Sequence, residues 1–206
     1  MEAIETAYKN YKFRSRLEAR WAVFFDSLGV KFEYEKEGFK LGKYYLPDFF
    51  LPEIRKGVWI EVKPDIISKK DIKANRLIYN LAQHTGCDSM LVKGEPILAI
   101  ETGPSDAPGA WDGSAYWMCF GKDHPGGEDG PYVFCVCPWC GKVGIEFDGR
   151  GARVCGYKKH FKSEKKALNA IKDKGHWRAD DKCYTWNDER IINACIAARQ
   201  ARFEFL

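Results

Sequence analysis

The sequence lacks the features that would place the protein in a membrane or on a secretory route. No stretch of its 206 residues approaches the run of about 20 apolar residues that a membrane-spanning helix needs. Its start, MEAIETAYKN, has neither the basic nor the apolar region of a signal peptide. We therefore expect a cytoplasmic protein without a membrane partner. In that compartment the eight cysteines are not expected to form disulfides, so metal binding is the first hypothesis for them.

Internal repeats and low-complexity tracts are also missing. What remains is an ordinary globular composition, 45% hydrophobic and 30% charged, with 7 Trp, 10 Tyr and 13 Phe. Aromatic side chains are rare in chains that never fold, so disorder across the whole chain is excluded. The length suits one sizeable core or two small domains.

Charge is unevenly spread along the chain, although the net charge is only +4. Residues 1–100 carry 17 basic and 14 acidic side chains, residues 101–149 carry 2 and 8, and residues 150–206 carry 14 and 7. A basic carboxy-terminal third favours a phosphate-rich partner such as nucleic acid. A solvated lysine face without any ligand would give the same counts.

Residues 1–100 alternate between helical and strand periods. Apolar spacing predicts a helix from Ser15, as N-cap, to about Leu28. The order αβββαβ that results is that of an α/β domain. The further expected elements are strands at 31–37, 44–51, 58–62 and 90–92, and a helix from about 68 to 86 between the last two strands.

Residues 101–115 concentrate Gly, Pro, Ser and Asp without periodicity, so we place a linker there. Residues 116–206 are predicted to form a second, smaller α+β domain, whose last helix packs on the core or on another subunit. Its expected elements are strands at 116–120 and 132–136, a hairpin of 142–147 with 153–154, and helices at 163–174 and 187–203.

Charged side chains stand out on two of the predicted strands. A period of two places Glu61 and Lys63 side by side on one face. Asp48 lies in an otherwise apolar strand, where an unpaired charge is costly unless it binds something. If these strands pair, Asp48 and Glu61 can share a divalent cation, and Mg²⁺ (or Mn²⁺) suits such oxygen ligands. Lys63 could orient a metal-bound water, and Glu18 on the first helix could reach the same place.

These residues resemble the motif of the PD-(D/E)xK, or restriction-endonuclease-like, nuclease superfamily. The motif reads PD at 47–48 and, after twelve residues, EVK at 61–63. The resemblance covers roughly residues 10–93, and the inferred αβββαβ order agrees with the core of that superfamily. The Arg, Ser and Glu pattern at 14–18 is similar to that of phage and transposon nucleases and junction resolvases.

The resemblance implies that Asp48 and Glu61 bind the catalytic metal, that Lys63 serves the attacking water and that Glu18 completes the site. It implies a metal-dependent endonuclease of a bacterium or a phage-infected cell, with DNA as the preferred substrate, although such a site does not itself distinguish DNA from RNA. A homodimer would suit a double-strand cut.

Plainer interpretations of the same residues stay open. Glu61 with Lys63 could be a solvated cross-strand pair, Asp48 a turn residue, and Glu18 a surface charge. The helix over 68–86 offers basic side chains that could contact phosphate or could simply form a solvated face. These side chains are Lys69, Lys70, Lys73 and Arg76.

Two close pairs of metal-ligating residues lie in the second domain, CxxC at Cys137 and Cys140 and CxxxxH at Cys155 and His160. The predicted hairpin could bring all four to a tetrahedral Zn²⁺ site, and a metal so enclosed would be structural. A redox dithiol is disfavoured, because a strand rather than a helix is expected after Cys140. Cys135 could replace Cys137 as a ligand, and the cysteines could instead be unrelated buried residues.

A basic segment follows this cluster. A zinc ribbon that carries it would suit a nucleic-acid clamp, whereas a solvated helix is the plainer alternative. The residues expected to contact nucleic acid are Lys158, Lys159, Lys162, Lys165 and Lys166. Among the other cysteines, Cys87, Cys119 and Cys195 are expected in apolar interior sites, and Cys183 with His176 forms a weaker spare pair.

Two functions besides a nuclease remain consistent with the sequence. One is a non-catalytic zinc-containing nucleic-acid-binding protein, in which the cysteine cluster and the basic segment carry the function. The other is a phage factor that acts by protein–protein interaction through the acidic segment 101–149.

Overall fold

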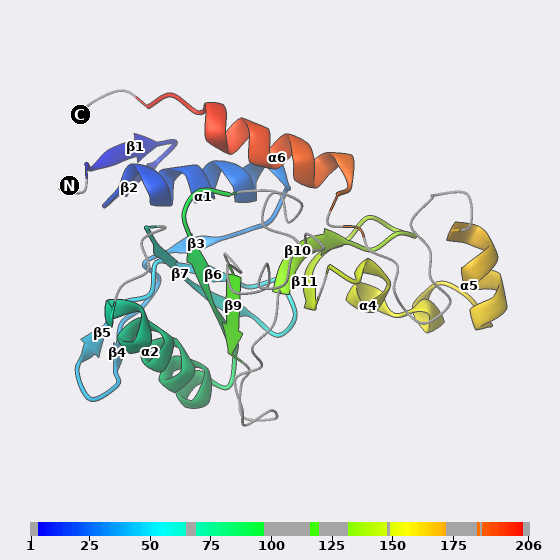
Figure 1. Ribbon diagram of the computed structural model, residues 1–206, viewed down its shortest axis with the longest axis horizontal. Coiled ribbons are helices and arrows are strands. Elements are labelled where there is room, and N and C mark those ends of the chain that lie inside the picture. Colours follow the sequence, from blue (N-terminus) through cyan, green and yellow to red (C-terminus); the bar gives the residue numbers. More distant parts are fainter. Residues whose placement is uncertain are drawn as a thin grey trace.

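A five-stranded sheet in the order β3-β6-β7-β8-β9 forms the centre of the computed structural model (Figure 1). The structure describes residues 4–64, 69–96, 116–119, 132–147, 149–171, 185 and 187–203. Strands β7 and β8 are parallel, and the other neighbours in the sheet are antiparallel. The strands are β3 (Glu33–Tyr34), β6 (Phe49–Leu51), β7 (Val58–Lys63), β8 (Asp88–Lys93) and β9 (Tyr116–Cys119).

Helices cover both faces of this sheet, with α1 (Arg16–Ser27) on one side and α2 (Lys69–Thr85) on the other (Figure 1). The period of two in β7 explains the two layers. Ile60 belongs to the buried cluster that includes α1, whereas Trp59 clusters with Leu81 of α2. The predicted mixture of helices and strands is therefore confirmed, and the order α1, β3, β6, β7, α2, β8 is present.

Local signals place α1 where the sequence predicts it. The Ser15 hydroxyl accepts a hydrogen bond from the Glu18 N–H at 3.2 Å, which makes Ser15 the N-cap. Leu28 is the C-cap, and Gly29 follows with a φ of +67°. Trp21 and Phe24 on the inner face of the helix are almost completely buried.

The strands before β7 are shorter than predicted. The expected strand over 44–51 divides into β5 (Tyr44–Tyr45), which pairs with β4 (Phe39–Lys40) in a separate hairpin, and β6. Pro47 lies at the break and has no N–H to donate to a strand ladder. The strand expected over 31–37 is reduced to β3, because Glu35 adopts a left-handed φ of +44°.

The second half of the chain adds one strand to the central sheet and a separate hairpin. β9 pairs with β8 in the central sheet, and β10 (Tyr132–Val136) forms a hairpin with β11 (Val143–Phe147). The predicted hairpin of 142–147 with 153–154 is wrong, because residues 153–154 lie in the helix α4 (Gly151–Cys155). This helix packs over β11 and does not extend its sheet. Val154 lies so close to Gly144 that a Cβ atom on residue 144 would be 2.7 Å from the Val154 side chain.

Three helices complete the described chain: η2 (Tyr157–Lys159), α5 (Glu164–Ile171) and α6 (Glu189–Gln200). The last of them packs along α1, which agrees with the expectation that it packs on the core. A further hairpin, β1 (Thr6–Tyr8) with β2 (Tyr11–Phe13), lies beside α1. None of the helices in the described ranges combines the length and apolar character needed to cross a membrane.

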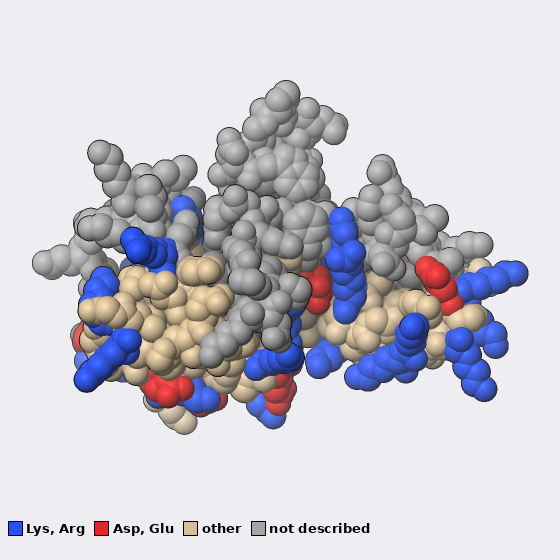
Figure 2. All heavy atoms as spheres, turned by 90° about the horizontal axis from the view of Figure 1, so that it is seen from below, with Lys and Arg blue, Asp and Glu red and all other residues tan. Residues whose placement is uncertain are grey.

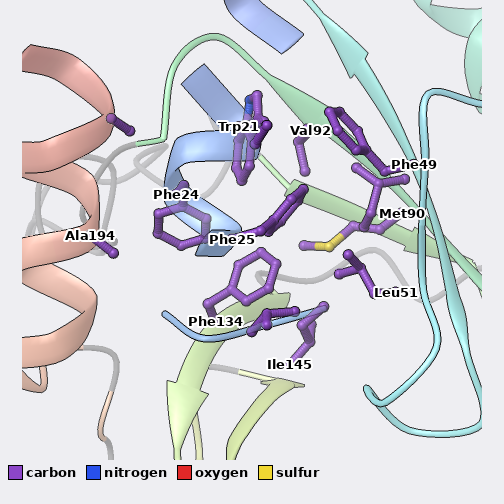
Figure 3. Packing of buried hydrophobic residues seen from close by; sticks show 14 of the residues in the cluster. Trp21, Phe24, Phe25, Phe49, Leu51, Met90, Val92, Phe134, Ile145 and Ala194 are labelled. Atoms are coloured by element: carbon purple, nitrogen blue, oxygen red, sulfur yellow. The ribbon is translucent and has the colours of Figure 1, made fainter. Parts of the chain in front are cut away.

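One buried cluster joins these elements (Figure 3). It brings Trp21 of α1, Phe49 of β6, Phe134 of β10, Ile145 of β11 and Ala194 of α6 into a single apolar core. The division into two domains at residues 101–115 stays a prediction. In the described residues, elements from both sides of that linker contribute to this cluster.

Candidate functional site

The pairing of β6 with β7 brings Asp48 level with Glu61. Phe49 lies opposite Ile60 in the antiparallel register, so the residue before Phe49 meets the residue after Ile60. Both acidic residues are buried, with 3% of Asp48 and 6% of Glu61 exposed. Carboxylates are seldom buried unless they are paired or bound, so two of them on neighbouring strands mark this end of the sheet as a candidate site.

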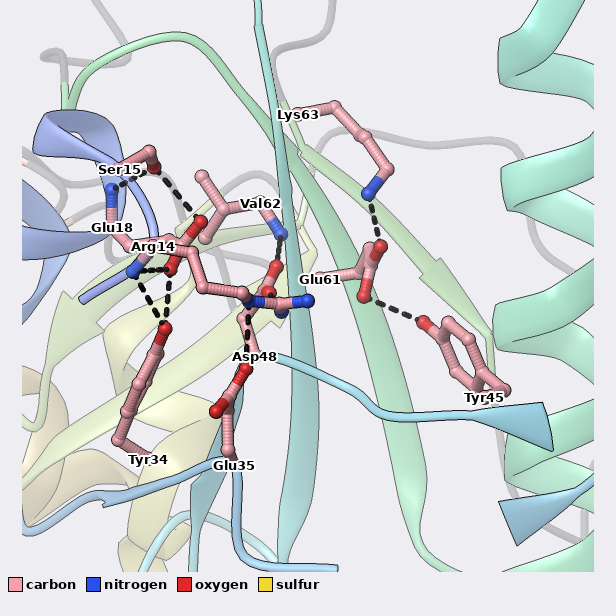
Figure 4. A network of polar contacts seen from close by, with 10 residues as sticks. All are labelled: Arg14, Ser15, Glu18, Tyr34, Glu35, Tyr45, Asp48, Glu61, Val62 and Lys63. Carbon is pink, nitrogen blue, oxygen red and sulfur yellow. Dashed lines mark hydrogen bonds and ion pairs between the residues drawn. The ribbon is translucent and has the colours of Figure 1, made fainter. Parts of the chain in front are cut away.

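Asp48 contacts both the sheet and an arginine (Figure 4). Its Oδ2 accepts a hydrogen bond from the Val62 N–H at 2.7 Å, and its Oδ1 accepts one from Nη2 of Arg14 at 2.5 Å. Burial raises the pKa of Asp48 well above its ordinary value, and repulsion from Glu61 and Glu18 raises it further. Asp48 therefore lies within electrostatic reach of both other acids.

Glu61 and Lys63 form the ion pair that the period of two predicts. The other carboxylate oxygen of Glu61 accepts a hydrogen bond from the Tyr45 hydroxyl at 2.7 Å. Burial and the charge of Glu61 raise the pKa of Tyr45, so the phenol keeps its proton and acts as a donor. Tyr45 thereby fixes the orientation of the Glu61 side chain.

Glu18 reaches the site from α1. Its Oε2 accepts hydrogen bonds from the Tyr34 hydroxyl at 2.6 Å and from the Arg14 N–H at 3.2 Å, and its Oε1 accepts one from the Ser15 hydroxyl at 2.8 Å. Burial and the hydrogen bond to Glu18 raise the pKa of Tyr34. Asp48 and Glu18 are therefore linked through the backbone and the side chain of Arg14.

Three buried carboxylates, from α1, β7 and the residue before β6, lie at this end of the sheet, and oxygen ligands of this kind are the ones that hard divalent cations use. In this conformation, however, the oxygens of Asp48 and Glu61 already accept hydrogen bonds or ion pairs from Arg14, Val62, Tyr45 and Lys63. They do not form a compact ligand set. Among the described residues, the one group of three or more metal-ligating side chains with closely spaced ligand atoms is the Cys/His cluster.

Four residues of this network were not assigned to the site from the sequence: Arg14, Tyr34, Glu35 and Tyr45. Tyr34 lies in the strand predicted over 31–37, and a partly buried tyrosine hydroxyl usually needs a hydrogen-bond partner. The other contacts join residues that are distant in sequence.

The Cys/His cluster unites Cys137, Cys140, Cys155 and His160, with all four ligand atoms within 4.8 Å of one another. The Cys137 Sγ lies 3.4 Å from Nε2 of His160, and the sulfurs of Cys140 and Cys155 are 3.8 Å apart. Tetrahedral Zn²⁺ with bonds of about 2.3 Å to sulfur and about 2.05 Å to nitrogen separates two sulfurs by about 3.8 Å and sulfur from nitrogen by about 3.6 Å. The cluster can therefore hold a metal such as zinc.

Local structure positions these ligands. Cys137 and Cys140 flank a tight turn after β10, in which the Gly141 N–H donates to the Cys137 carbonyl at 2.8 Å and Gly141 has a φ of +73°. Cys155 ends α4, and the His160 ring lies beside Trp139 with ring centroids 5.3 Å apart. Four protein ligands leave no coordination position for a substrate.

The thiols of the turn differ in their electrostatics. Burial raises the pKa of Cys137 to about 11, whereas a hydrogen bond from the Lys142 N–H lowers the pKa of Cys140. Cys135 is buried and is not part of the cluster, so the structure places Cys137 rather than Cys135 among the ligands. Cys195 is buried as predicted, and Cys87 is half-buried. His176, Cys183 and the side chain of Cys119 lie outside the described residues.

Exposed lysines surround this cluster. Figure 2 shows Lys and Arg side chains gathered at the end of the molecule that η2 and α5 form. The exposed lysines there are Lys158, Lys159, Lys162, Lys165 and Lys166. Of the basic residues predicted on α2, Arg76 is exposed, and the side chains of Lys69, Lys70 and Lys73 lie outside the described residues.

Comparisons of the chain with protein-family models, with curated proteins and with solved structures gave no match.

Proposed function

We propose that the protein is a metal-dependent nuclease of the PD-(D/E)xK type that hydrolyses phosphodiester bonds, with DNA as its substrate in an endonucleolytic reaction. The observation that carries this proposal is the position of Asp48 level with Glu61 on paired strands, beside Lys63 and within electrostatic reach of Glu18. The order α1, β3, β6, β7, α2, β8, with β7 and β8 parallel, supports a restriction-endonuclease-like core.

Each residue has a role in this proposal. Asp48 and Glu61 would hold Mg²⁺ or Mn²⁺, which supplies polarisation of the phosphodiester and a bound water of lowered pKa. Lys63 orients the attacking water and offsets negative charge in the transition state. Tyr45 keeps Glu61 oriented through its hydroxyl, and Glu18 completes the acidic site from α1.

The Cys/His cluster and its lysines have a separate role. We assign a structural Zn²⁺ to Cys137, Cys140, Cys155 and His160. The exposed lysines beside it would contact the phosphate backbone of DNA, which gives affinity but no sequence preference. The zinc-bearing end would then hold the substrate while the carboxylate site cleaves it.

Incubation of the purified protein with plasmid, linear and single-stranded DNA, in Mg²⁺, Mn²⁺ or EDTA, tests the proposal. We expect metal-dependent cleavage by the native protein and none by Asp48→Ala. The variant Glu53→Ala is a matched control, because Glu53 is an exposed acid that pairs with Lys31 away from the site. Full activity of Asp48→Ala, or no cleavage by the native protein in either metal, would contradict the proposal.

A non-catalytic zinc-containing nucleic-acid-binding protein is the second candidate. The observation that favours it is that the four Cys/His ligand atoms lie close together, whereas the carboxylates have partners within the protein. This candidate predicts salt-sensitive DNA binding that is equal in the native protein and in Asp48→Ala, without any product in Mg²⁺.

A further inference from the structure

Arg14 lies at the centre of the carboxylate site. In Figure 4 its guanidinium lies against the side chains of Asp48 and Glu35. Its Nη2 donates to Asp48 at 2.5 Å, while its Nε forms an ion pair with Glu35 at 2.7 Å. About half of the Arg14 side chain, 52%, is exposed, although the Asp48 side chain that it contacts is only 4% exposed. Arg14 thus connects the buried acid to the surface.

The backbone at Glu35 places its carboxylate where it forms the ion pair with Arg14. It adopts a left-handed φ of +44°, a conformation that is uncommon for a residue with a side chain and that is retained at sites where the surrounding structure imposes it. Its own N–H donates to the Asp48 carbonyl at 2.9 Å, which ties it to the start of β6. The Arg14 guanidinium therefore forms an ion pair with Glu35 at Nε and a hydrogen bond with Asp48 at its outer nitrogen Nη2.

The charges of the site are balanced in pairs. Lys63 neutralises Glu61, and Arg14 neutralises Asp48. A buried carboxylate without a cation is strongly unfavourable, so the Arg14 contact stabilises this arrangement. The same contact occupies Oδ1 of Asp48, an oxygen that a metal ligand must offer.

We propose that Arg14 has two positions and serves the substrate in the second. It pairs with Asp48 while the acidic site holds no divalent cation. When Asp48 and Glu61 hold a cation, Arg14 leaves Asp48, stays attached to Glu35 through Nε and donates from its outer nitrogens to a non-bridging oxygen of the bound phosphate. A planar guanidinium suits that contact, because its N–H groups match phosphate oxygens. This inference rests on the proposed nuclease function.

Divalent-cation binding separates this role from a merely structural one. With zinc-loaded full-length protein, Mn²⁺ affinity would be measured by calorimetry for the native protein, Arg14→Gln, Asp48→Ala and the matched control Arg202→Gln, an exposed arginine near the end of the chain. Removal of the competing cation should make Arg14→Gln bind Mn²⁺ about two- to fivefold more tightly, the range expected for loss of a partly exposed ion pair. Its cleavage rate should nevertheless fall at least about tenfold, because a phosphate contact is lost. Arg202→Gln should match the native protein in both.

The outcomes are distinct. Suppose that the native protein binds Mn²⁺, that Asp48→Ala does not, and that Arg14→Gln binds it no more tightly than the native protein. This result overturns the role of Arg14 and leaves the nuclease proposal standing. Absence of Mn²⁺ binding by the native protein overturns both. A thermal melt checks that Arg14→Gln is folded. If Arg14→Gln does not fold, Glu35→Gln is the second variant, because it removes the ion pair that Glu35 makes with Arg14. Glu35→Gln is expected to bind Mn²⁺ about twofold more tightly than the native protein. Unchanged Mn²⁺ affinity in Glu35→Gln overturns the proposal.

Discussion

The carboxylate site and the Cys/His cluster differ in what their oxygen, sulfur and nitrogen atoms face. In the cluster, the four ligand atoms face one another within 4.8 Å. In the carboxylate site, the oxygens of Asp48 and Glu61 face protein donors, namely Arg14, Val62, Tyr45 and Lys63. The first arrangement suits an enclosed metal, whereas a divalent cation in the second, which we propose, would have to displace protein donors from the carboxylates.

The two regions are also physically connected. Nη1 of Arg190, at the start of α6, donates to the Gly141 carbonyl at 2.8 Å beside the Cys/His turn. The helix then packs along α1, which carries Glu18. A metal held by the cluster would therefore also support the helix layer on which the other region is built.

Substitutions at the carboxylate site should give the largest effect. Glu61→Gln removes a proposed metal ligand, and we expect its cleavage rate to fall by at least about 10³-fold. Lys63→Gln keeps both acids, so it should retain Mn²⁺ binding while its rate falls by about 10²- to 10³-fold. Single-turnover cleavage and calorimetry give the two quantities, with Lys31→Gln as an exposed control. If both variants lost Mn²⁺ affinity equally, the assignment of Glu61 as a metal ligand and of Lys63 as the group that orients the water would be contradicted.

Loss of a ligand in the Cys/His cluster should leave the chemistry in place but weaken the fold. Cys155→Ser is expected to lose stoichiometric zinc and to melt roughly 10 °C lower, because about 3 to 5 kcal/mol of stability is lost and each kcal/mol shifts Tm by about 2 to 4 °C in a chain of this size. Metal analysis and a thermal melt measure these effects. Cys87→Ser lies outside the cluster and should retain zinc. Full zinc content in Cys155→Ser would exclude the assigned ligand set.

The shared core predicts that the two regions unfold together. Phe134→Ala on β10 should lower the free energy of unfolding by about 3 to 5 kcal/mol, because the cavity opens against Trp21 and Phe24 of α1. Tyr44→Ala, at a side chain with 68% exposure, should change it by no more than about 0.5 kcal/mol. Urea unfolding followed by tryptophan fluorescence and circular dichroism gives these values. Two separate transitions would show that the regions are independent.

The raised pKa of Asp48 predicts a pH dependence of stability at the carboxylate site. The folded state holds the Asp48 proton more tightly than the unfolded state, whose pKa is about 3.9. The stability that the protonated Asp48 side chain contributes is fully present below the pKa of the unfolded state. It is lost as the pH rises through the pKa of Asp48 in the folded state. The stability of Asp48→Asn minus that of the native protein, the margin, should therefore grow with pH in metal-free buffer. Urea unfolding between about pH 4 and pH 8 measures the margin, and a constant or shrinking margin would contradict the assignment.

Phosphate contacts at the zinc-bearing end should give the smallest effect. Replacing Lys158, Lys159 and Lys162 by Gln should lower the slope of log affinity for DNA against log salt by about 2 to 3, since each lost phosphate contact contributes about 0.9. The matched triple substitution of Lys9, Lys12 and Lys31, which are exposed elsewhere, should leave the slope unchanged. Equal slopes for the two triple variants would place the DNA contacts outside η2 and its vicinity.

Local signals were enough to predict part of this molecule. The cap at Ser15 defined α1, and a period of two assigned the faces of β7, including the Glu61 and Lys63 pair. The spacing of CxxC and CxxxxH also predicted which cysteines come together, although the hairpin expected to join them is a helix packed over β11.

Contacts that are distant in sequence account for what the sequence did not predict. Arg14 meets Asp48 across 34 residues, and Tyr45 meets Glu61 across 16. No periodicity encodes such pairs, because they depend on how β6 is placed beside β7 and on the break at Pro47. The pairing of β9 with β8 and the packing of α6 on α1 are decided in the same way, by which apolar surface is left to cover.

Anomalous diffraction from crystals of the zinc-loaded protein soaked in Mn²⁺ would test the two-centre account most directly. We predict one peak at the manganese edge in contact with carboxylate oxygens of Asp48 and Glu61, and a separate peak at the zinc edge enclosed by Cys137, Cys140, Cys155 and His160. A zinc peak alone, with Arg14 still bound to Asp48 at saturating Mn²⁺, would contradict the claim that the acidic end of the sheet is a catalytic metal site.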